Sequence, residues 1–281
     1  MSSNFLRFMM RFGRRLFRNT PIQKLKITTL IYKKFAQKAF GEDPIEVPFR
    51  GVRIIYPGGD YTTLPTLMDG VYEKVELDAL ISYLDSLTSP IDTVDIGANV
   101  GIWTVLLASH QNVRRVIAFE PSQENLAYLR SNLELNKVTN KVTIVESAVS
   151  DVNGEVVFDD SGSGATKRIA TTGNTVVPSV SLDTYLKDMS VNLIKIDVEG
   201  HEPLVLSGCW KTIESSMPTL FIEYSLPQVV AAGLSWEHAG DRLVQVYGGF
   251  SLLSDAGIER SQDFAILEND NRLLNLLFQK K

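Results

Sequence analysis

The sequence predicts an α/β fold: a doubly wound, mainly parallel sheet of seven strands, with an N-terminal helical extension and an inserted hairpin. Two observations predict it. From residue 92 onward, short apolar runs alternate with helical stretches, which is the pattern of successive βαβ units. A glycine-rich turn follows the first of these runs, as it does in sheets that bind nucleotides. A chain of 281 residues, 44% of them hydrophobic, is long enough to bury the core of such a domain.

Composition limits the partners of this domain. The first 40 residues carry ten Lys or Arg and no acid, which leaves 18 basic against 33 acidic residues, a net charge of −15, in the remainder. An acidic surface disfavours nucleic acid as a partner. The single cysteine, Cys209, cannot form an internal disulfide, and no apolar run reaches the roughly 18 residues that span a bilayer. We therefore expect a cytoplasmic protein.

The basic extension, which we place at residues 1–48, is predicted to contain two helices joined by a connector to the main domain. The first helix, which Thr20-Pro21 ends, has an apolar face from Phe5 to Leu16, and its opposite face carries Arg7, Arg11, Arg14 and Arg18. This pattern is typical of a helix lying on an anionic surface. The second helical pattern runs over 22–40, and the Pro-containing segment 42–48 indicates the connector. Two interpretations stay open: peripheral contact with the inner membrane surface through residues 1–40, or docking on the protein's own body or a second subunit.

The main domain, residues 49–281, is expected to begin with a strand at 51–56 and a helix at 72–87, followed by the regular alternation. The seven strands of the sheet are predicted at 93–96, 116–119, 142–145, 193–196, 219–222, 250–253 and 274–278. Helices are predicted between them at 101–109, 123–136, 202–214 and 236–247. An extra hairpin, 154–159 with 176–181, interrupts the alternation. Its polar, glycine-rich connection is either a substrate lid or a solvent-facing loop.

The glycine-rich turn indicates which cofactor the sheet binds. Gly97 and Gly101 let the backbone turn tightly and approach a ligand closely. A dinucleotide fingerprint needs two further glycines, and Asn99 and Ile102 stand in their places. Asp95 would repel the pyrophosphate of NAD, whereas its carboxylate suits the α-ammonium of a methionine moiety, directly or through water. The cofactor indicated is S-adenosylmethionine.

Two more strand ends complete the predicted cofactor site. Glu120 lies 19 residues past Gly101, and its carboxylate can accept hydrogen bonds from both hydroxyls of a ribose. Ser147 and the backbone at Ala148 are placed to meet an adenine, although a simple turn explains them as well. Helix N-capping is the alternative role for Asp95 and Glu120. The cofactor-binding candidates are Asp95, Gly97, Ala98, Asn99, Gly101, Glu120, Pro121, Ser147 and Ala148.

Ionisable residues gather where the fourth strand ends. Alternation places Lys195 and Asp197 on one face of that strand, with Glu199 and His201 in the loop that follows and Glu223 at the end of the neighbouring strand. Methyl transfer to a hydroxyl requires removal of the acceptor proton, which a carboxylate or imidazole can perform. These five residues are the catalytic candidates. Two alternatives stay open: a buried Lys195–Asp197 pair with helix capping by Glu199, or a divalent metal bound by Asp197, Glu199 and Glu223. We assign no metal.

These motifs resemble the FkbM family of S-adenosylmethionine-dependent methyltransferases. The resemblance covers about residues 92–225, and its blocks are Val94–Gly101, Ala118–Pro121, Val180–Asp183, Leu193–Glu202 and Pro218–Glu223. It implies a Rossmann-like class I methyltransferase fold and, most often, O-methylation of a sugar or polyketide-like hydroxyl. It also implies that Asp95, Gly97, Asn99 and Gly101 form the cofactor loop, that Glu120 contacts the ribose, and that Lys195, Asp197 and Glu199 lie near the transfer site. His201 stands where other members often have a small residue.

The sequence therefore predicts an S-adenosylmethionine-dependent O-methyltransferase. Its expected acceptor is a glycan, a glycolipid or a related small molecule with a hydroxyl group. Two functions of other classes are the alternatives: a nicotinamide-dependent oxidoreductase, and a non-catalytic module that docks on membranes.

Overall fold

The computed structural model describes residues 43–58, 63–161, 167–254 and 256–280. The two basic helices predicted within residues 1–40 lie outside the described residues. The chain forms two compact units, residues 1–72 and 73–281, and a domain boundary at residue 48 stays a prediction. Within the ranges described, no helix combines the length and the apolar character that crossing a bilayer requires.

The described part of the first unit is a hairpin and a short helix. Strand β1 (Ile45–Phe49) pairs antiparallel with β2 (Val52–Tyr56), and helix α3 covers Thr63–Met68. The prediction of a connector at 42–48 is therefore wrong for most of that segment. Alternate residues of β1 are buried (Ile45, Val47 and Phe49), and Pro48 falls on the exposed side. A proline does not exclude a strand in a two-stranded hairpin, where only one side of the strand is paired.

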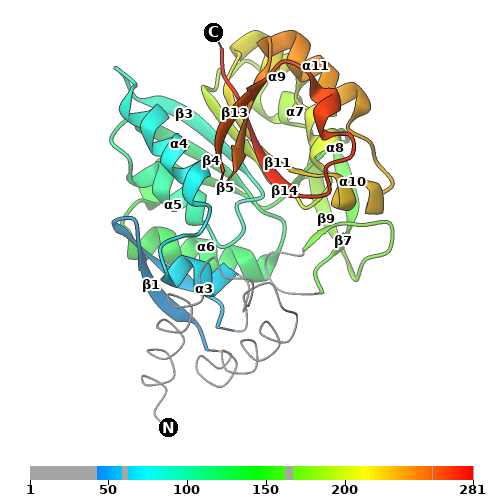
Figure 1. Ribbon diagram of the computed structural model, residues 1–281. Coiled ribbons are helices and arrows are strands. Elements are labelled where there is room, and N and C mark those ends of the chain that lie inside the picture. Colours follow the sequence, from blue (N-terminus) through cyan, green and yellow to red (C-terminus); the bar gives the residue numbers. More distant parts are fainter. Residues whose placement is uncertain (1–42, 59–62, 162–166, 255, 281) are drawn as a thin grey trace, which may run out of the picture. The chain divides into compact units, whose positions relative to one another are not determined.

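The second unit is built on a sheet of eight strands (Figure 1). They are β3 (Ile91–Ile96), β4 (Val113–Phe119), β5 (Val142–Val145), β10 (Leu193–Ile196), β11 (Thr219–Ser225), β12 (Phe250–Ser254), β13 (Gly257–Ser261) and β14 (Leu273–Phe278). Their order is β13-β12-β14-β11-β10-β3-β4-β5. The pairs from β11 to β5 are parallel, and the pairs that β14, β12 and β13 make are antiparallel. All seven predicted strands are confirmed. The eighth, β13, is an exposed edge strand, so it lacks the apolar run that would predict it.

Helices cover both faces of this sheet. Helices α4 (Lys74–Asp85) and α5 (Ile102–Ser109) lie on one side, and α8 (Glu202–Ser207), α9 (Trp210–Ser216) and α11 (Glu237–Tyr247) lie on the other (Figure 1). The unit also contains α6 (Gln123–Leu135), α7 (Leu182–Leu186), α10 (Leu226–Ala231) and the 3₁₀ turns η2 (Thr139–Lys141) and η4 (Phe264–Leu267). The single helix predicted at 202–214 is divided into α8 and α9 at Gly208. A Cβ at Gly208 would lie 2.0 Å from the carbonyl oxygen of Ser150, so this close approach requires glycine.

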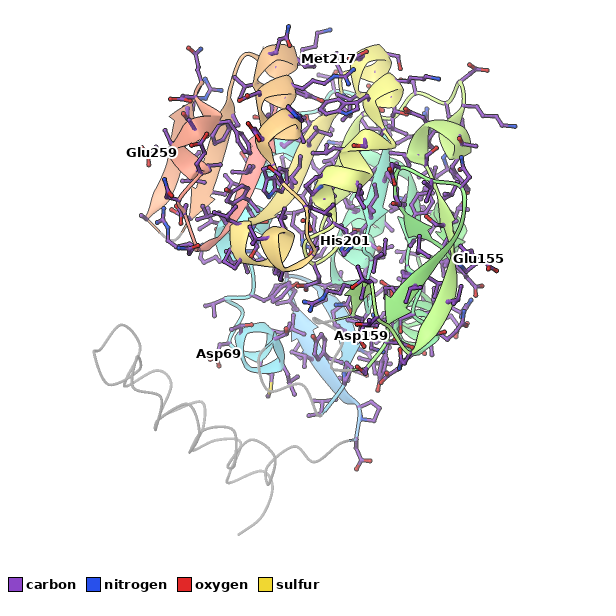
Figure 2. The ribbon with its side chains drawn as sticks, turned by 90° about the vertical axis from the view of Figure 1, so that its right-hand side faces the viewer. Asp69, Glu155, Asp159, His201, Met217 and Glu259 are labelled. Carbon is purple, nitrogen blue, oxygen red and sulfur yellow. The ribbon has the colours of Figure 1, made fainter. Side chains whose placement is uncertain are left out.

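The inserted hairpin is part of a second, smaller sheet. Strands β7 (Gly154–Asp159) and β9 (Thr175–Val180) form the hairpin, while β6 (Ala148–Val149) and β8 (Arg168–Ile169) extend it in the order β6-β9-β7-β8. The small core of this sheet consists of Ala148, Phe158 and Val177. Figure 2 shows Glu155 of β7 at the outer surface and His201, in the turn before α8, within the unit.

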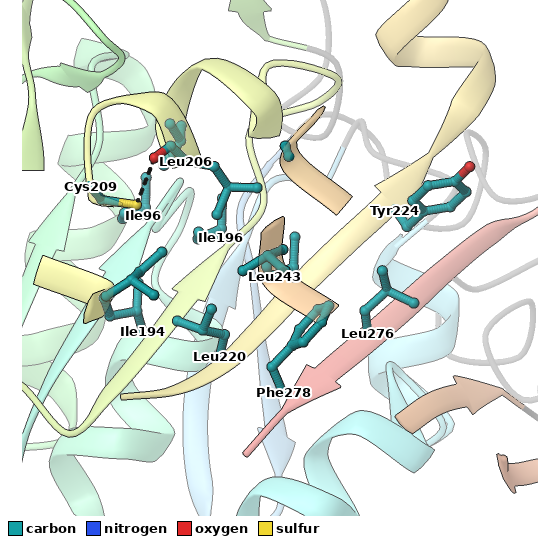
Figure 3. Packing of buried hydrophobic residues seen from close by; sticks show 14 of the residues in the cluster. Ile96, Ile194, Ile196, Leu206, Cys209, Leu220, Tyr224, Leu243, Leu276 and Phe278 are labelled. Atoms are coloured by element: carbon teal, nitrogen blue, oxygen red, sulfur yellow. Dashed lines mark hydrogen bonds between the residues drawn. The ribbon is translucent and has the colours of Figure 1, made fainter. Parts of the chain in front are cut away.

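The main core lies between the central strands and the helices α7, α8, α9 and α11. Figure 3 shows Ile194 and Ile196 of β10 packed with Leu220 of β11 and Phe278 of β14. Cys209 belongs to this core, as expected for a lone apolar thiol, and its Sγ lies 3.5 Å from the carbonyl oxygen of Leu206. Because β3, β4, β5, β10 and β11 run parallel, their carboxyl ends meet at one edge, and the predicted site residues lie at or just after these ends.

Candidate active site

The glycine-rich loop after β3 is held directly against the end of β10. The amides of Gly97 and Ala98 both donate to the carbonyl oxygen of Phe119, at 3.1 and 2.9 Å. Gly97 has φ +78°, and a Cβ there would lie 1.8 Å from the carbonyl oxygen of Asp197. Gly101 is the N-cap of α5 with φ +91°, and a Cβ there would lie 2.4 Å from Leu129 Cδ1. The two sequence motifs therefore touch through a backbone contact that only glycine permits.

Asp95 lies beneath this loop with none of its surface exposed. Its Oδ2 accepts a hydrogen bond from Thr104 Oγ1 at 2.5 Å, and its Oδ1 lies 3.6 Å from Lys195 Nζ. Burial raises the pKa of Asp95, and the Lys195 ammonium opposes that shift. Its predicted contact with a methionine ammonium stays a prediction.

Lys195 is a fixed, buried cation between the two motifs. Its Nζ lies 3.0 Å from Asp197 Oδ2, donates to the carbonyl oxygen of Gly97 at 3.2 Å, and sits 5.9 Å from the centre of the Trp103 ring. Burial alone would lower the pKa of Lys195, but Asp197 and Asp95 raise it above its ordinary value. The side chain is thus a permanent positive charge. The Lys195–Asp197 pair considered as an alternative is present, but only Lys195 is buried, because Asp197 is 22% exposed.

The loop after Asp197 is capped by Glu202 instead of Glu199. Glu202 Oε1 accepts from the amides of Val198 and Gly200, at 3.0 and 3.2 Å. The N-cap position of α8 is His201, whose side chain makes no capping hydrogen bond. Helix capping therefore does not account for Glu199, which is left for another role.

Glu120 is buried at the end of β4 and is heavily hydrogen-bonded. Its Oε2 accepts from the amide of Asn99 at 2.7 Å, and its Oε1 accepts from the amide of Ser122 at 2.9 Å and from Asn125 Nδ2 at 3.2 Å. Burial raises the pKa of Glu120, and these donors together with Lys167 counteract the rise. A carboxylate has about four acceptor positions. One on Oε2 is therefore left for a ligand hydroxyl.

The remaining cofactor-binding candidates, Pro121, Ser147 and Ala148, follow β4 and β5. Pro121 lines a cavity of about 350 Å³ together with Gln123, Glu146, Asp160 and residues of β9. Ser147 and Ala148 are buried in the turn that leads from β5 to β6, where the Ser147 amide donates to the carbonyl oxygen of Val145 at 2.9 Å. The simple-turn geometry is thus present, and an adenine contact stays a prediction.

Three carboxylates converge at the ends of β10 and β11. Asp197, Glu199 and Glu223 each offer one oxygen, and these atoms all lie within 4.8 Å of one another. Burial, with the negative charge of Asp197, raises the pKa of Glu199 to about 8 and raises that of Glu223 well above its ordinary value. Such a trio can hold a divalent cation, or it can accept and share protons.

Gln228, at the start of α10, holds one member of this trio. Its Nε2 donates a hydrogen bond to Glu199 Oε2, and Glu199 itself has a left-handed backbone with φ +58°. A Cβ at Gly200 would lie 2.8 Å from the backbone of Gln228, so α10 packs tightly on the loop. The orientation of the Glu199 carboxylate is therefore fixed by a helix that follows a different strand.

His201 is buried and electrically neutral near pH 7. Burial, with a smaller contribution from Arg168, lowers the pKa of His201 to about 4. Its Nδ1 has no hydrogen-bond partner within the described part of the chain. A neutral imidazole can accept a proton only weakly here, which makes the carboxylate trio the better base.

Sequence reasoning missed several residues of this edge. Glu73, just before α4, accepts a hydrogen bond from Trp103 Nε1 at 2.5 Å, and its charge adds to the field that raises the pKa of Lys195. Gln228 and Lys167 were missed as well. Trp103, two residues after Gly101, was the one residue near a motif that could have pointed to this edge. Glu73, Gln228 and Lys167 lie in segments with no motif, and they reach the site only through tertiary packing.

Comparison with known proteins identifies the family. The family model "Methyltransferase FkbM domain" matches residues 95–242, more than half of the chain. The chain belongs to the FkbM methyltransferase domain family. The matched range contains the glycine-rich loop, Glu120 and the carboxylate trio.

Two curated proteins share part of this FkbM domain. The hexuronic acid methyltransferase AglP of Haloferax volcanii is 28% identical over 126 residues, which cover 43% of this chain and 51% of AglP. The AMB antimetabolite synthetase AmbE of Pseudomonas aeruginosa is 35% identical over 92 residues, 31% of this chain and 4% of AmbE. The match thus spans about half of the first relative and a small part of the second.

A solved structure supports the fold of the FkbM domain. The S-adenosylmethionine-dependent methyltransferase from Agrobacterium tumefaciens superimposes with a TM-score of 0.50 at 12% identity, covering 86% of this chain and 71% of that one. At this identity the likeness concerns the fold alone. The predicted Rossmann-like class I methyltransferase fold is confirmed.

Proposed function

We propose that this FkbM domain transfers the methyl group of S-adenosylmethionine to a hydroxyl of a glycan, a glycolipid or a related small molecule. The observation that carries the proposal is the contact between the two motifs, in which the position of a Cβ on Gly97 falls 1.8 Å from the Asp197 carbonyl oxygen. A ligand on the glycine-rich loop would therefore lie beside the carboxylate trio. Such closeness is what a group transfer between two bound molecules needs.

The residues present fit S-adenosylmethionine. Gly97 and Gly101 give the loop its tight turn, with φ +78° and +91°, and Glu120 keeps one acceptor position for a ribose hydroxyl. The acidic edge, with Lys195 as its buried counter-charge, suits a cofactor that carries a positive sulfonium and an ammonium group. When bound, S-adenosylmethionine supplies an electrophilic methyl group.

The protein's part in the reaction is positioning and proton removal. We assign the acceptor hydroxyl to the carboxylate trio, where Glu199, oriented by Gln228, accepts its proton. A pKa of about 8 leaves Glu199 partly ionised at neutral pH and makes it a stronger base than an ordinary carboxylate. The neighbouring Glu223 can share the proton. Lys195 holds the Asp197 side chain in place, with its Nζ 3.0 Å from Asp197 Oδ2.

The proposal that the methyl acceptor is a glycan is supported by the similarity to AglP. AglP is, by its name, a methyltransferase of hexuronic acid, a sugar that carries both hydroxyl groups and a carboxyl group. Because AglP is 28% identical to this chain over 126 residues, it supports a sugar as the acceptor here.

Calorimetric titration tests the cofactor assignment. The wild-type protein should bind S-adenosylmethionine and should not bind NAD(H), and Asp95→Ala should abolish the binding because it removes the buried partner of Lys195 beneath the loop. Asp92→Ala is the matched control, since Asp92 begins the same strand at the opposite edge and pairs with Arg114 and Arg115. Full affinity in Asp95→Ala would overturn the role of Asp95, and a wild type that binds NAD(H) instead would overturn the function.

A further inference from the structure

We infer that Lys167 is a positioning residue of the cofactor site, through which the inserted sheet holds Glu120 and the glycine-rich loop. The inference rests on the proposed function, because it concerns the binding of S-adenosylmethionine. Lys167 and the inserted sheet lie outside the sequence motifs, and the inference gives them a role in cofactor binding.

Lys167, the residue before β8, is buried against the start of α6. Its side chain is 2% exposed. The Nζ atom donates to Ser122 Oγ at 3.0 Å and forms ion pairs with Glu124 Oε2 at 2.7 Å and Asp160 Oδ1 at 2.9 Å. All three hydrogens of the ammonium thus have a protein acceptor, which is the condition for keeping a charge out of water.

Ser122 connects Lys167 to Glu120 through two hydrogen bonds. The Ser122 hydroxyl accepts from Lys167 and donates to Asp160 Oδ1 at 2.8 Å, while the Ser122 amide donates to Glu120 Oε1 at 2.9 Å. The other oxygen of Glu120 accepts from the amide of Asn99. A chain of four residues therefore links the insertion to the loop that is proposed to hold the cofactor.

The charge of Lys167 adds to the hydrogen bonds from Ser122, Asn99 and Asn125 that favour the ionised form of the buried Glu120. Burial disfavours the charged form of Glu120, and Lys167 is the cation whose field opposes that effect. The ion pairs with Glu124 and Asp160 outweigh burial at Lys167 itself and raise its pKa, so the ammonium stays charged. An ionised Glu120 offers its remaining acceptor position to a ribose hydroxyl more strongly than a neutral one does.

Calorimetry with S-adenosylmethionine on the full chain tests the inference. Lys167→Met should weaken the binding of S-adenosylmethionine roughly tenfold, because Glu120 then becomes a poorer acceptor for the ribose hydroxyl. Lys167→Arg, which keeps the charge, should restore most of the affinity, and Lys167→Gln, which keeps a donor for Ser122 without the charge, should fall between them. In the Glu120→Gln background, Lys167→Met should have almost no further effect, since both residues act through one carboxylate.

The control is Lys141→Met. Lys141 is also partly buried, but its Nζ donates to the carbonyl oxygens of His110 and Val113 near the amino end of β4. This variant should bind S-adenosylmethionine like the wild type. Two results would overturn the inference and leave the proposed function intact. One is an unchanged affinity for S-adenosylmethionine in both Lys167→Met and Lys167→Gln. The other is that the losses of binding free energy caused by Lys167→Met and Glu120→Gln add in the double variant. A wild type that does not bind S-adenosylmethionine would overturn the proposed function itself.

Discussion

At the scale of single residues, the site combines one permanent cation with several carboxylates that differ in charge state. Lys195 is held positive by Asp197 and Asp95, whereas burial and the charge of Asp197 raise the pKa values of Glu199 and Glu223. The same edge therefore contains a fixed positive charge and groups that can take up protons. This division is what acid–base chemistry beside a cationic cofactor requires.

The protonation of Glu199 should be visible in stability as well as in activity. Its folded pKa of about 8 lies above the ordinary value of 4.5, so the folded state holds more protons than the unfolded state between these values. Its contribution to stability is therefore complete below pH 4.5 and is lost as pH rises toward 8. Glu199→Gln stays neutral and can still accept from Gln228, so its stability advantage over the wild type should grow from pH 6 to pH 8.5.

Urea denaturation at the two pH values measures this difference. Glu155→Gln, on the exposed face of β7, is the control and should follow the wild type at both. If Glu199→Gln and the wild type lose the same stability between pH 6 and 8.5, Glu199 does not carry the proton. In the methyl-transfer assay, the wild-type rate should rise through pH 8 as Glu199 becomes ionised.

At the scale of elements, the decisive feature is the contact between the loop after β3 and the end of β10. Parallel pairing of the two strands brings Ile96 beside Ile196, and the Asp197 amide donates to the carbonyl oxygen of Ile96 at 3.1 Å. Gly97 then turns away with a positive φ while its Cα lies against the Asp197 carbonyl. The close approach of the two motifs is thus a consequence of strand register.

Gly97→Ala should destabilise the fold by roughly 3 to 5 kcal/mol, because a Cβ would overlap the Asp197 carbonyl oxygen and also requires an unfavourable φ. Gly233→Ala separates the two effects. Gly233 has φ +74° but nothing within 4 Å of a Cβ, so this change should cost only about 1 kcal/mol. Chemical denaturation of both variants gives the comparison, and equal losses would mean that the contact with Asp197 is not tight.

At the scale of the whole molecule, charge is divided along the sequence. Residues 1–40 carry ten basic residues and no acid, and the remainder has a net charge of −15. We propose that the basic segment makes peripheral contact with anionic lipid, which would bring the enzyme to a lipid-linked glycan acceptor.

Vesicle sedimentation tests this contact. The full chain should sediment with phosphatidylglycerol vesicles and not with phosphatidylcholine vesicles, and added salt should release it. Replacing Arg7, Arg11, Arg14 and Arg18 by Gln should weaken the binding more than a hundredfold, at roughly 1 kcal/mol per arginine. Sedimentation that is unaffected by these replacements would contradict a role for the arginine face. Methyl transfer to a water-soluble acceptor should be unchanged in the same variant.

Much of the fold could be predicted from the sequence because the central strands are buried on both faces. Such strands appear as short apolar runs, and β3, β10 and β11 were found in this way. Strands β1 and β13 were missed for the opposite reason. β1 contains a proline, and β13 is exposed along almost its whole length, so neither has the apolar pattern of a core strand.

The candidate site divides in the same way. By itself the sequence determined which residues lie at or near strand ends, because parallel strands bring their carboxyl ends to one edge. Glu120 and Asp197 directly follow their strands, and Asp95 and Glu223 lie within the last three residues of theirs. Only the tertiary structure decided which partners those residues have. Lys167 reaches Ser122 across 45 residues, and Gln228 reaches Glu199 across 29. The spacing of apolar residues along the sequence indicates which side chains are buried. The contacts of Lys167 and Gln228 depend instead on how the inserted sheet and helix α10 pack against the main sheet.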